Sequence, residues 1–547
     1  MKMVQMQKRM DQLIPLHIPF SFVCETRPQR TAYVDLSKNK SFTYEELGLK
    51  INRMANALKS EGIGYGDLVM SSVFNSVDAI IANYATWTVG AIYCPISYFL
   101  AAGQIAYCMK DSQPKFYLYD EWLVETAQDA LQMSEWKPTK CLCTNDMNSY
   151  LTQFSSDSCG SPPELGAFDE AIRLYTSGTT GMPKGVPHCH MDAYICGLTH
   201  SLYGMHWTPN DRLLVIAPYF HAAGNLPAYV PALSSGMTVV SMKKFDPKTT
   251  LKSVEDIGVT FMMGPPTAFD ALVKEVQNGY QGNFASFRAA MLMGAPIPVQ
   301  LYRSLRDVFG IEIFNGDGCT EALYCHTLSP WDPPEKWEGE ATAKNGIALP
   351  GNLIRVVKQY PHKKADPDDI VPRDGETVGE LIVKNVHHPG LYLNLPEKSK
   401  QTFQNGWYYS GDSATWDQDS YNHLVGRSDD RILSGGENIY PEEVESRILE
   451  HPWVADCVVV GVPDPKWGQL VTAYVSSADP SLTKEELDAF LKANKYLENY
   501  KRPRLYLFTK TLPYTATGKK QRYIVRKQAL EDADQGRLER IFERERE

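Results

Sequence analysis

Helical and strand-like stretches alternate through the first ~430 residues, and this alternation constrains the fold more than any other feature of the sequence. Residues 42–62 place apolar side chains on one helical face and begin with a capping box from Thr43 to Glu46. A strand-like, a helical and a second strand-like stretch follow at residues 67–73, 77–91 and 92–96. Such repeats favour parallel sheets covered by helices, so we expect an α/β fold with doubly wound sheets.

The sequence changes character near Asp429. A charged turn, a glycine pair and a proline occupy residues 426–445, and the strand-like and helical stretches that follow suit a small α+β unit. A chain of 547 residues is also too long for one ordinary hydrophobic core. We therefore predict a large N-terminal domain over residues 1–428 and a small C-terminal domain over residues 429–547.

Charge, hydropathy and cysteine content exclude several classes of partner. The formal net charge of -10 gives no electrostatic footprint for nucleic acid or an anionic membrane surface. We find no uninterrupted apolar run of the ~18 residues that a membrane-spanning helix needs, and no convincing secretory signal. The eleven cysteines are an odd number without zinc-like spacing, so we expect reduced thiols and a cytoplasmic protein.

The segment from Tyr175 to Gly185, YTSGTTGMPKG, concentrates hydroxyl groups, glycines and one lysine on a single loop. Strand-like residues precede it and the residues after Val186 have a helical pattern, which predicts a strand-to-helix turn that favours an anion. The candidate phosphate ligands are Thr176, Ser177, Gly178, Thr179, Thr180 and Lys184. The pattern is not a Walker A loop, since Pro183 and Gly185 flank the lysine. A flexible surface loop of the same composition is the alternative.

The whole string resembles the phosphate loop of the acyl-adenylate-forming superfamily. This superfamily includes acyl- and aryl-CoA ligases, adenylation domains of peptide synthetases and beetle luciferases. Eight further segments match it in order, at residues 42–47, 90–96, 218–224, 293–298, 317–321, 408–412, 426–445 and 512–522. The resemblance covers nearly the whole chain and implies an ATP-dependent ligase with a mobile C-terminal domain.

The resemblance implies roles for residues around the nucleotide. Asp412 would bind the ribose hydroxyls, and Arg427 would contact the ribose-phosphate side. Glu321 would hold Mg²⁺ beside the phosphates, and Thr320 next to it is a further candidate catalytic residue. The other nucleotide contacts would come from Gly294, Ala295, Pro296, Asn315, Gly316 and Asp317. Without the family, Asp412 is a turn former, Glu321 an acid in the first turn of a helix, and Arg427 a solvated charge.

Asp317 departs from the family pattern. Many members have an aromatic residue there that stacks on adenine, and an aspartate cannot stack. A tight turn formed by Asp317 and Gly318 is the alternative reading of this pair. The stacking role would then fall to Pro296 or to the backbone.

The carboxylic acid is expected in a pocket lined by Tyr219, Phe220, His221, Met293 and Gly318. The resemblance places His221 beside the carboxylate as a gate or orienting group, and a hydrogen-bonded core histidine is the alternative. Cys319 and Cys325 flank the same segment without an identifiable base, so we interpret them as packing residues. These residues favour an aryl or a short to medium aliphatic acid.

The last family segment carries Lys519, whose counterpart in the family is needed for adenylation. Its ammonium group would stabilise charge on the carboxylate and the α-phosphate in the transition state. Lys520 stands where the family more often has an aliphatic residue, so the assignment is open by one position. After adenylation, rotation about a hinge at Asp429 would withdraw the lysine and present Gly435 and Gly436 to pantetheine.

The predicted reaction is activation of a carboxylic acid as an acyl-adenylate, followed by transfer to a thiol. ATP, Mg²⁺ and coenzyme A are the expected cofactors. The first alternative is a stand-alone adenylating enzyme that loads the phosphopantetheine of a separate carrier protein. Luciferase-type oxygenation is more distant, and a catalytically silent nucleotide- or acyl-binding protein is the alternative from another class.

Overall fold

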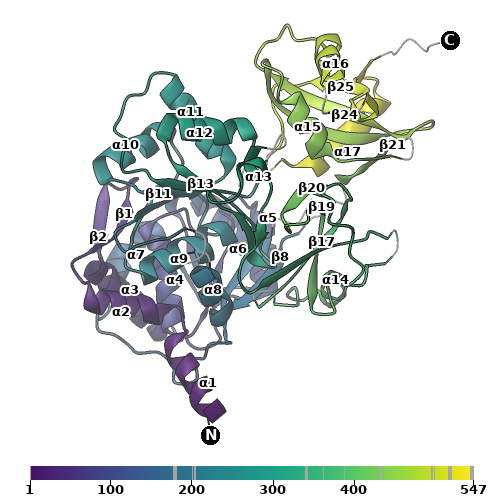
Figure 1. The fold of residues 1–547 in the computed structure, drawn as a ribbon. Coiled ribbons are helices and arrows are strands. Elements are labelled where there is room, and N and C mark those ends of the chain that lie inside the picture. The colour runs from purple at the N-terminus through teal and green to yellow at the C-terminus, as the bar shows by residue number, and fades with distance from the viewer. Residues whose placement is uncertain are drawn as a thin grey trace, which may run out of the picture.

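The computed structural model describes residues 2–176, 182–199, 201, 205–338, 343–360, 363–386, 389–427, 430–434, 437–494, 497, 499–514 and 520–541. Within these ranges the strands form four sheets, and the fourth is built from the C-terminal residues alone (Figure 1).

The largest sheet has the strand order β15-β14-β13-β12-β11-β9-β10-β1-β2. Its strands are β1 (Thr31–Asp35), β2 (Lys40–Thr43), β9 (Arg212–Val215), β10 (Thr238–Ser241), β11 (Phe261–Gly264), β12 (Ala289–Met293), β13 (Glu312–Cys319), β14 (Leu323–Leu328) and β15 (Ile347–Ala348). The central strands from β1 to β13 in this order are parallel, whereas β2, β14 and β15 pair antiparallel. The carboxyl ends of the parallel strands therefore share one edge.

The second sheet has the strand order β6-β5-β3-β4-β7-β8. Its strands are β3 (Leu68–Ser72), β4 (Ile92–Pro95), β5 (Phe116–Tyr119), β6 (Lys140–Cys143), β7 (Glu170–Thr176) and β8 (Lys184–Cys189). All of these pairs are parallel except the pair of β7 and β8.

Helices cover these two sheets in layers. They are α1 (Lys2–Leu13), α2 (His17–Thr26), α3 (Tyr44–Ser60), α4 (Val77–Thr88), α5 (Ala102–Ser112), α6 (Val124–Met133), α7 (Thr144–Leu151), α8 (His190–Leu198), α9 (Val230–Ser234), α10 (Pro247–Ile257), α11 (Pro266–Gln277), α12 (Val299–Phe309) and α13 (Pro334–Glu338). One core packs α3, α4 and α8 with strands of both sheets, and a second packs α10–α12 on the nine-stranded sheet. A third core joins α5 and α6 to the second sheet.

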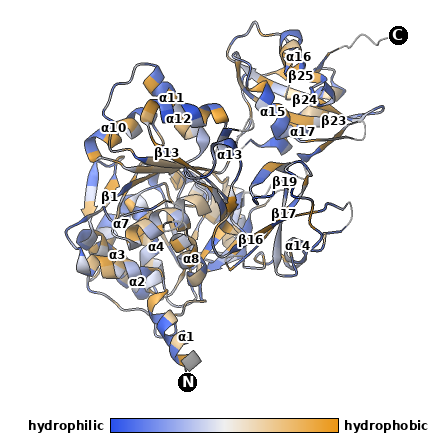
Figure 2. Ribbon diagram, viewed as in Figure 1, coloured by the Kyte–Doolittle hydropathy of each residue, from blue (hydrophilic) through white to orange (hydrophobic). Residues whose placement is uncertain are grey.

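The figures show the same layering. Figure 1 shows α10, α11 and α12 side by side over the nine-stranded sheet. In Figure 2 these helices carry both hydrophilic and hydrophobic residues, as expected for helices that cover one face of a sheet. The predicted doubly wound α/β architecture is confirmed.

Helix α3 forms where local signals predicted it. Thr43 accepts a hydrogen bond from the Glu46 N–H, and the Glu46 side chain accepts one from the Thr43 N–H. The apolar face is buried through Leu47, Ile51, Met54 and Leu58. The chain turns away after Ser60 at Gly62, whose φ of +73° suits glycine.

A third, antiparallel sheet lies between the nine-stranded sheet and the C-terminal residues. It contains β16 (Asn352–Val357), β17 (Gly379–Asn385), β18 (Phe403–Gln404), β19 (Trp407–Trp416) and β20 (Asn422–Arg427), with α14 (Pro396–Thr402) before β18. Its small apolar cores involve both faces of β19.

The C-terminal residues form their own sheet and cores. The elements are β21 (Ile432–Ser434), β22 (Glu437–Ile439), α15 (Pro441–Ile448), β23 (Val454–Asp464), β24 (Gly468–Ser477), α16 (Lys484–Ala493), β25 (Leu505–Phe508), α17 (Arg522–Asp534) and β26 (Glu539–Arg540). This arrangement is the expected small α+β unit. The proposed boundary at residues 428 and 429 lies outside the described residues and stays a prediction.

In the described ranges, no helix is both long enough and apolar enough to cross a membrane.

Candidate functional site

Three predicted segments meet at one edge of the nine-stranded sheet. Residues 218–224 follow β9, residues 294–298 follow β12, and residues 315–321 complete β13 and the turn after it. These strands are parallel neighbours in the sheet, with β11 between β9 and β12. The carboxyl edge of parallel strands is where open α/β sheets bind ligands, so the fold brings these segments to one site.

The predicted phosphate loop connects two strands, which corrects the expected strand-to-helix turn. Strands β7 and β8 pair antiparallel with Thr176 opposite Lys184, and α8 begins only at His190. The residues around Val186 continue a strand because their backbone pairs with β7 and alternate side chains are buried in the sheet. Strands β7 and β8 therefore form an antiparallel pair. Ser177, Gly178, Thr179 and Thr180 lie outside the described residues.

Thr176 and Lys184 are the described residues on either side of this loop. The hydroxyl oxygen of Thr176 is buried and has no hydrogen-bond partner in the described part of the protein. A buried polar atom without a partner costs free energy unless a ligand or water satisfies it. This hydroxyl group is therefore a candidate ligand contact at the base of the loop.

Thr320 and Glu321 lie in the hairpin turn between β13 and β14, so the helix-turn reading of Glu321 is wrong. The tight-turn reading of Asp317 and Gly318 is also wrong, because both residues pair with β14 as part of β13. A Cβ atom on Gly318 would lie 2.0 Å from the carbonyl oxygen of Leu323. Leu323 has a φ of +52°, which is costly for a bulky side chain. The packing of the protein thus holds this turn in a strained conformation.

Tyr392 joins the two charged residues of the predicted phosphate site. Its hydroxyl group donates to Glu321 Oε1 at 2.7 Å, and the Lys184 ammonium group lies 4.6 Å from the centre of its ring. Tyr392 and Glu321 are both buried. Our sequence reasoning missed Tyr392, since 71 residues separate it from Glu321 and its neighbours form no ligand-binding pattern. The fold brings Lys184 and Glu321 together, as one phosphate and metal site requires.

The pKa values in this cluster shift with burial. Burial lowers the pKa of the Lys184 ammonium group, and the Glu321 carboxylate opposes this shift. Burial also raises the pKa of the Tyr392 hydroxyl group, and the charge of Glu321 adds to that shift. Tyr392 is therefore a neutral hydrogen-bond donor near pH 7.

Asp412 and Arg427 form an ion pair across the third sheet. They lie opposite each other on β19 and β20, with Arg427 Nη1 donating to Asp412 Oδ1 at 2.7 Å and to the Ser410 carbonyl group at 2.9 Å. The turn-former alternative for Asp412 is thus wrong, because this residue is inside a strand, whereas Arg427 is ion-paired while its own side chain stays 40% exposed. Burial raises the pKa of the Asp412 carboxyl group, and Arg427 opposes the shift.

A hydrogen-bond network holds the Asp317 carboxylate. His326 Nε2 lies 2.7 Å from Oδ2, and the Asn345 amide group donates to the same oxygen at 3.0 Å. The Gly318 N–H group donates to Oδ1 at 2.8 Å. Asn345 also accepts from the Leu424 N–H group, which links β13 to β20. The aspartate at the position of the family's aromatic residue is therefore part of the protein's own framework.

The predicted acid-pocket residues differ in exposure. The Tyr219 ring packs on Tyr229 in the core, and its hydroxyl oxygen lies 3.5 Å from that of Tyr33. Phe220 and Met293 are also buried. By contrast, Gly318 and residues 294–296 are exposed at the edge of the sheet. The Tyr219 side chain thus packs inside the protein, while the exposed backbone lies where a nucleotide or acid would bind.

His221 caps a short 3-10 turn over residues Ala222–Gly224. Its Nδ1 atom accepts from the Ala223 N–H group at 3.2 Å, which assigns the proton of the neutral ring to Nε2. A Cβ atom on Gly224 would lie 2.2 Å from the Pro218 carbonyl oxygen, so only glycine closes this turn without a clash. The turn therefore fixes the orientation of the His221 ring, while its role stays a prediction.

The cysteines near the site are packing residues, as expected. Burial raises the pKa of the Cys319 and Cys325 thiols, so both are neutral near pH 7. All eleven cysteines are free thiols. The described residues also include no cluster of three or more His, Cys, Asp or Glu side chains suited to a metal ion.

Lys520 is anchored in the C-terminal sheet. Its ammonium group lies 3.1 Å from a carboxylate oxygen of Glu445 and 3.1 Å from one of Asp456. The backbone of Lys520 pairs with Tyr514 as an isolated bridge. These contacts favour Lys519 as the residue that serves the nucleotide. Lys519, Asp429, Gly435 and Gly436 lie outside the described residues.

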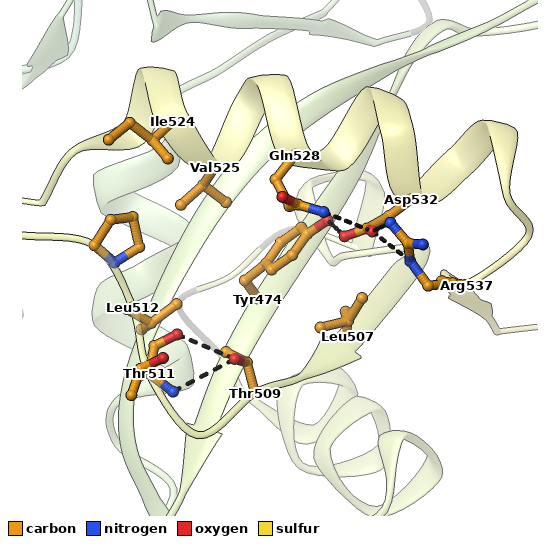
Figure 3. Close-up of a pocket in the computed structure, with 11 residues that line it drawn as sticks. Tyr474, Leu507, Thr509, Thr511, Leu512, Ile524, Val525, Gln528, Asp532 and Arg537 are labelled. Atoms are coloured by element: carbon orange, nitrogen blue, oxygen red, sulfur yellow. Dashed lines mark hydrogen bonds and ion pairs between the residues drawn. The ribbon is translucent and has the colours of Figure 1, made fainter.

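A separate hollow of ≈ 550 Å³ lies in the C-terminal unit, bordered by β24, β25 and α17 (Figure 3). Its polar end is formed by Tyr474 and Arg537, which both donate to Asp532. Gln528 donates to the same carboxylate at 3.0 Å. Because these polar groups satisfy one another, the hollow is not the candidate nucleotide site.

Two protein-family models match this chain. Residues 20–392 match AMP-binding enzymes, and residues 443–519 match the C-terminal domain of the same enzymes. The chain belongs to the AMP-binding enzyme family. The predicted resemblance to adenylate-forming enzymes is thereby confirmed.

Relatives of this AMP-binding enzyme match it along nearly their whole length. Feruloyl-CoA synthase of an Amycolatopsis species is 31% identical over 483 residues, which are 88% of this chain and 92% of that protein. A long-chain-fatty-acid–CoA ligase of Mycobacterium tuberculosis is 29% identical over 92% of this chain and 96% of that protein. These matches confirm the expected class of AMP-forming acid–thiol ligase.

A solved structure supports the fold. An anthranilate CoA ligase in complex with anthranoyl-AMP has a TM-score of 0.84 at 23% identity, covering 95% of this chain and 98% of that chain. The similarity confirms the α/β architecture with its C-terminal unit.

Proposed function

We propose that this AMP-binding enzyme activates a carboxylic acid with ATP and transfers the acyl group to coenzyme A. The observation that carries this proposal is the cluster at Tyr392, which holds Lys184 of β8 near the Glu321 carboxylate, in the turn that follows β13 at the carboxyl edge of the main sheet. Opposite charges fixed at such an edge suit a polyphosphate and its counter-ion.

The phosphates of ATP would lie between the hairpin loop and the turn after β13. Lys184 would bind the outer phosphates, with the Thr176 hydroxyl group and residues 177–180 as further donors. The buried Glu321 carboxylate fits Mg²⁺, which prefers oxygen ligands and would neutralise phosphate charge there. Asp412 and Arg427 would bind the ribose and its phosphate.

The first half-reaction places the acid carboxylate in line with the α-phosphorus. The carboxylate oxygen bonds to phosphorus as pyrophosphate leaves, which turns that oxygen into part of a good leaving group. His221 would orient the acid, and Lys519 would stabilise charge on the reacting oxygens.

The second half-reaction requires the lysine to leave the site. We propose that the C-terminal unit rotates about Asp429, so that Gly435 and Gly436 face the pantetheine arm. The thiol then attacks the acyl carbon, and AMP leaves with the electron pair of the broken bond. The free cysteines support a reducing compartment, which we propose to be the cytoplasm.

Adenylation and acceptor choice are tested with one panel of acids. Benzoates and aliphatic acids from C2 to C12 are incubated with ATP and hydroxylamine, and hydroxamate is measured. We expect hydroxamate with an aryl or a short to medium aliphatic acid. AMP release with coenzyme A is then compared with release with a carrier protein. Faster release with the carrier protein would overturn the choice of acceptor, and no hydroxamate with any acid would overturn the proposed function.

A further inference from the structure

We propose that Tyr392 is a positioning residue that keeps Lys184 and Glu321 apart in the nucleotide-free enzyme. Lys184 then stays available to the phosphates of ATP, and Glu321 to Mg²⁺. This inference rests on the proposed function, because it concerns how the enzyme receives ATP together with Mg²⁺. It assigns to one side chain the spacing between the residue that binds phosphate and the residue that binds the metal ion.

The contacts of Tyr392 reach both charges. Its hydroxyl group donates to Glu321 Oε1 at 2.7 Å, while its ring lies 4.6 Å below the Lys184 ammonium group. The ring attracts the cation through its negative face, and the hydroxyl group holds the anion through a proton. The two charges are thus bound by opposite parts of one side chain.

Lys184 and Glu321 do not form a direct ion pair. The charge of Glu321 acts on Lys184, yet within the described residues no ion pair of 4.0 Å or less joins them. Opposite charges at such proximity attract strongly in a partly buried site. Tyr392 contacts both charges, the ammonium group with its ring and the carboxylate with its hydroxyl group, and is therefore placed to hold them apart.

A second trio in the same chain shows that the ring and hydroxyl contacts of a tyrosine do not by themselves separate a lysine from a carboxylate. Tyr150 donates to Glu61 at 2.7 Å, and the Lys140 ammonium group lies 4.8 Å from the Tyr150 ring. Here the lysine also contacts the carboxylate directly, at 3.1 Å. The same three residue types form a direct ion pair away from the site and none within it, so the separation at the site requires that Tyr392 itself be held in place.

The backbone around Tyr392 keeps its ring in place. The Tyr392 N–H group donates to the Ser399 hydroxyl oxygen at 2.8 Å, and the Leu393 N–H group donates to the Gly185 carbonyl group at 2.8 Å. The second bond ties this segment to β8, next to Lys184. The ring is therefore fixed relative to the strand that carries the lysine.

Two variants separate the ring from the hydroxyl group. Tyr392→Phe keeps the ring between the charges but removes the donor to Glu321. Tyr392→Leu removes both and allows Lys184 to pair with Glu321. Tyr150→Phe is the matched control, because it removes the corresponding hydroxyl group from the other trio.

ATP affinity is measured by calorimetry without an acid substrate, once with EDTA and once with Mg²⁺. In EDTA we expect Tyr392→Phe to bind ATP as tightly as the wild type does. The factor by which Mg²⁺ increases the ATP affinity should be about tenfold smaller in this variant, since one charge-assisted hydrogen bond is lost. Tyr392→Leu should bind ATP more weakly in both conditions. The control should match the wild type throughout.

The outcomes distinguish the spacing role from the proposed function. The spacing role alone would be overturned if Mg²⁺ increased the ATP affinity of Tyr392→Phe as much as that of the wild type. It would also be overturned if Tyr392→Leu bound ATP with unchanged affinity in EDTA. Failure of the wild type to bind ATP would overturn both proposals. Thermal melting of each variant excludes loss of folding as the cause, and Tyr392→Phe is close to isosteric.

Discussion

At the scale of single residues, basic side chains of the C-terminal unit that are held in ion pairs can be distinguished from the lysine proposed for catalysis. Arg522 lies 2.7 Å from a carboxylate oxygen of Glu442 and 2.8 Å from one of Glu445. Lys520 is paired with Glu445 as well. Removing one partner from such a buried network leaves an uncompensated charge, so these residues stabilise the fold. We therefore propose Lys519, and not Lys520, as the lysine that stabilises charge during adenylation.

This assignment predicts opposite effects for two neighbouring lysines. Lys519→Ala should lower the rate of acyl-adenylate formation about 100-fold without a change in thermal stability, because it removes charge stabilisation in the transition state. Lys520→Met should lower the free energy of unfolding by up to about 3 kcal/mol, because the buried Glu445 and the half-buried Asp456 lose their ion pairs with the lysine. Pyrophosphate exchange and urea unfolding measure the two effects. The reverse pattern would move the catalytic role to Lys520.

At the scale of elements, the hairpin of β13 and β14 determines where Glu321 lies. The Gly318 backbone approaches Leu323 so closely that no side chain fits, and Leu323 itself is in a left-handed conformation. His188 Nε2 lies 2.7 Å from the Thr320 carbonyl oxygen, which ties the turn to β8. The position of the carboxylate is thus set by backbone contacts between two sheets.

We expect Gly318→Ala to displace this turn. The new methyl group would collide with the Leu323 carbonyl oxygen, at a cost of about 1–3 kcal/mol in stability, and pyrophosphate exchange should fall at least tenfold as Glu321 moves. Gly64→Ala is the control, because its Cβ atom would meet nothing within 4 Å. Wild-type exchange by Gly318→Ala would show that the turn does not position the carboxylate.

At the scale of the whole molecule, local signals predicted the elements, while contacts distant in sequence determined the site. The capping box of α3 and the alternation of strands and helices depend on neighbouring residues, and both were predicted correctly. The strand after the phosphate loop was predicted as a helix because its character depends on pairing with β7. Tyr392 and the partners of Asp317 were missed because they come from distant parts of the chain.

Two buried histidines predict that the enzyme loses stability in acid. His17 lies 2.6 Å from the Ser161 hydroxyl oxygen, and His190 accepts from the Leu16 N–H group at the start of α2. Burial lowers the pKa of His17 to about 4 and that of His190 to about 3.

The direction in which stability changes with pH follows from the number of protons that the folded and unfolded states bind. In the unfolded chain both rings bind protons near pH 6.5, so between that pH and about 4 the unfolded state holds more protons than the folded state. Stability should therefore fall by several kcal/mol as the pH drops through this window. Urea unfolding at pH 7, 6 and 5 measures the slope, which the double variant His17→Gln and His190→Gln should reduce. An unchanged slope in that variant would assign the acid sensitivity to other groups.

The anchoring of Lys520 has a consequence for how the enzyme turns over. The Gln521 N–H group donates to the Pro513 carbonyl group at 2.9 Å, and Tyr514 pairs with Lys520, so the chain is fastened to its own unit immediately before and after residues 515–519. In the proposed rotation about Asp429, Tyr514 and Lys520 would move with the entire C-terminal unit, and the friction of the surrounding solvent would limit the rate of that step.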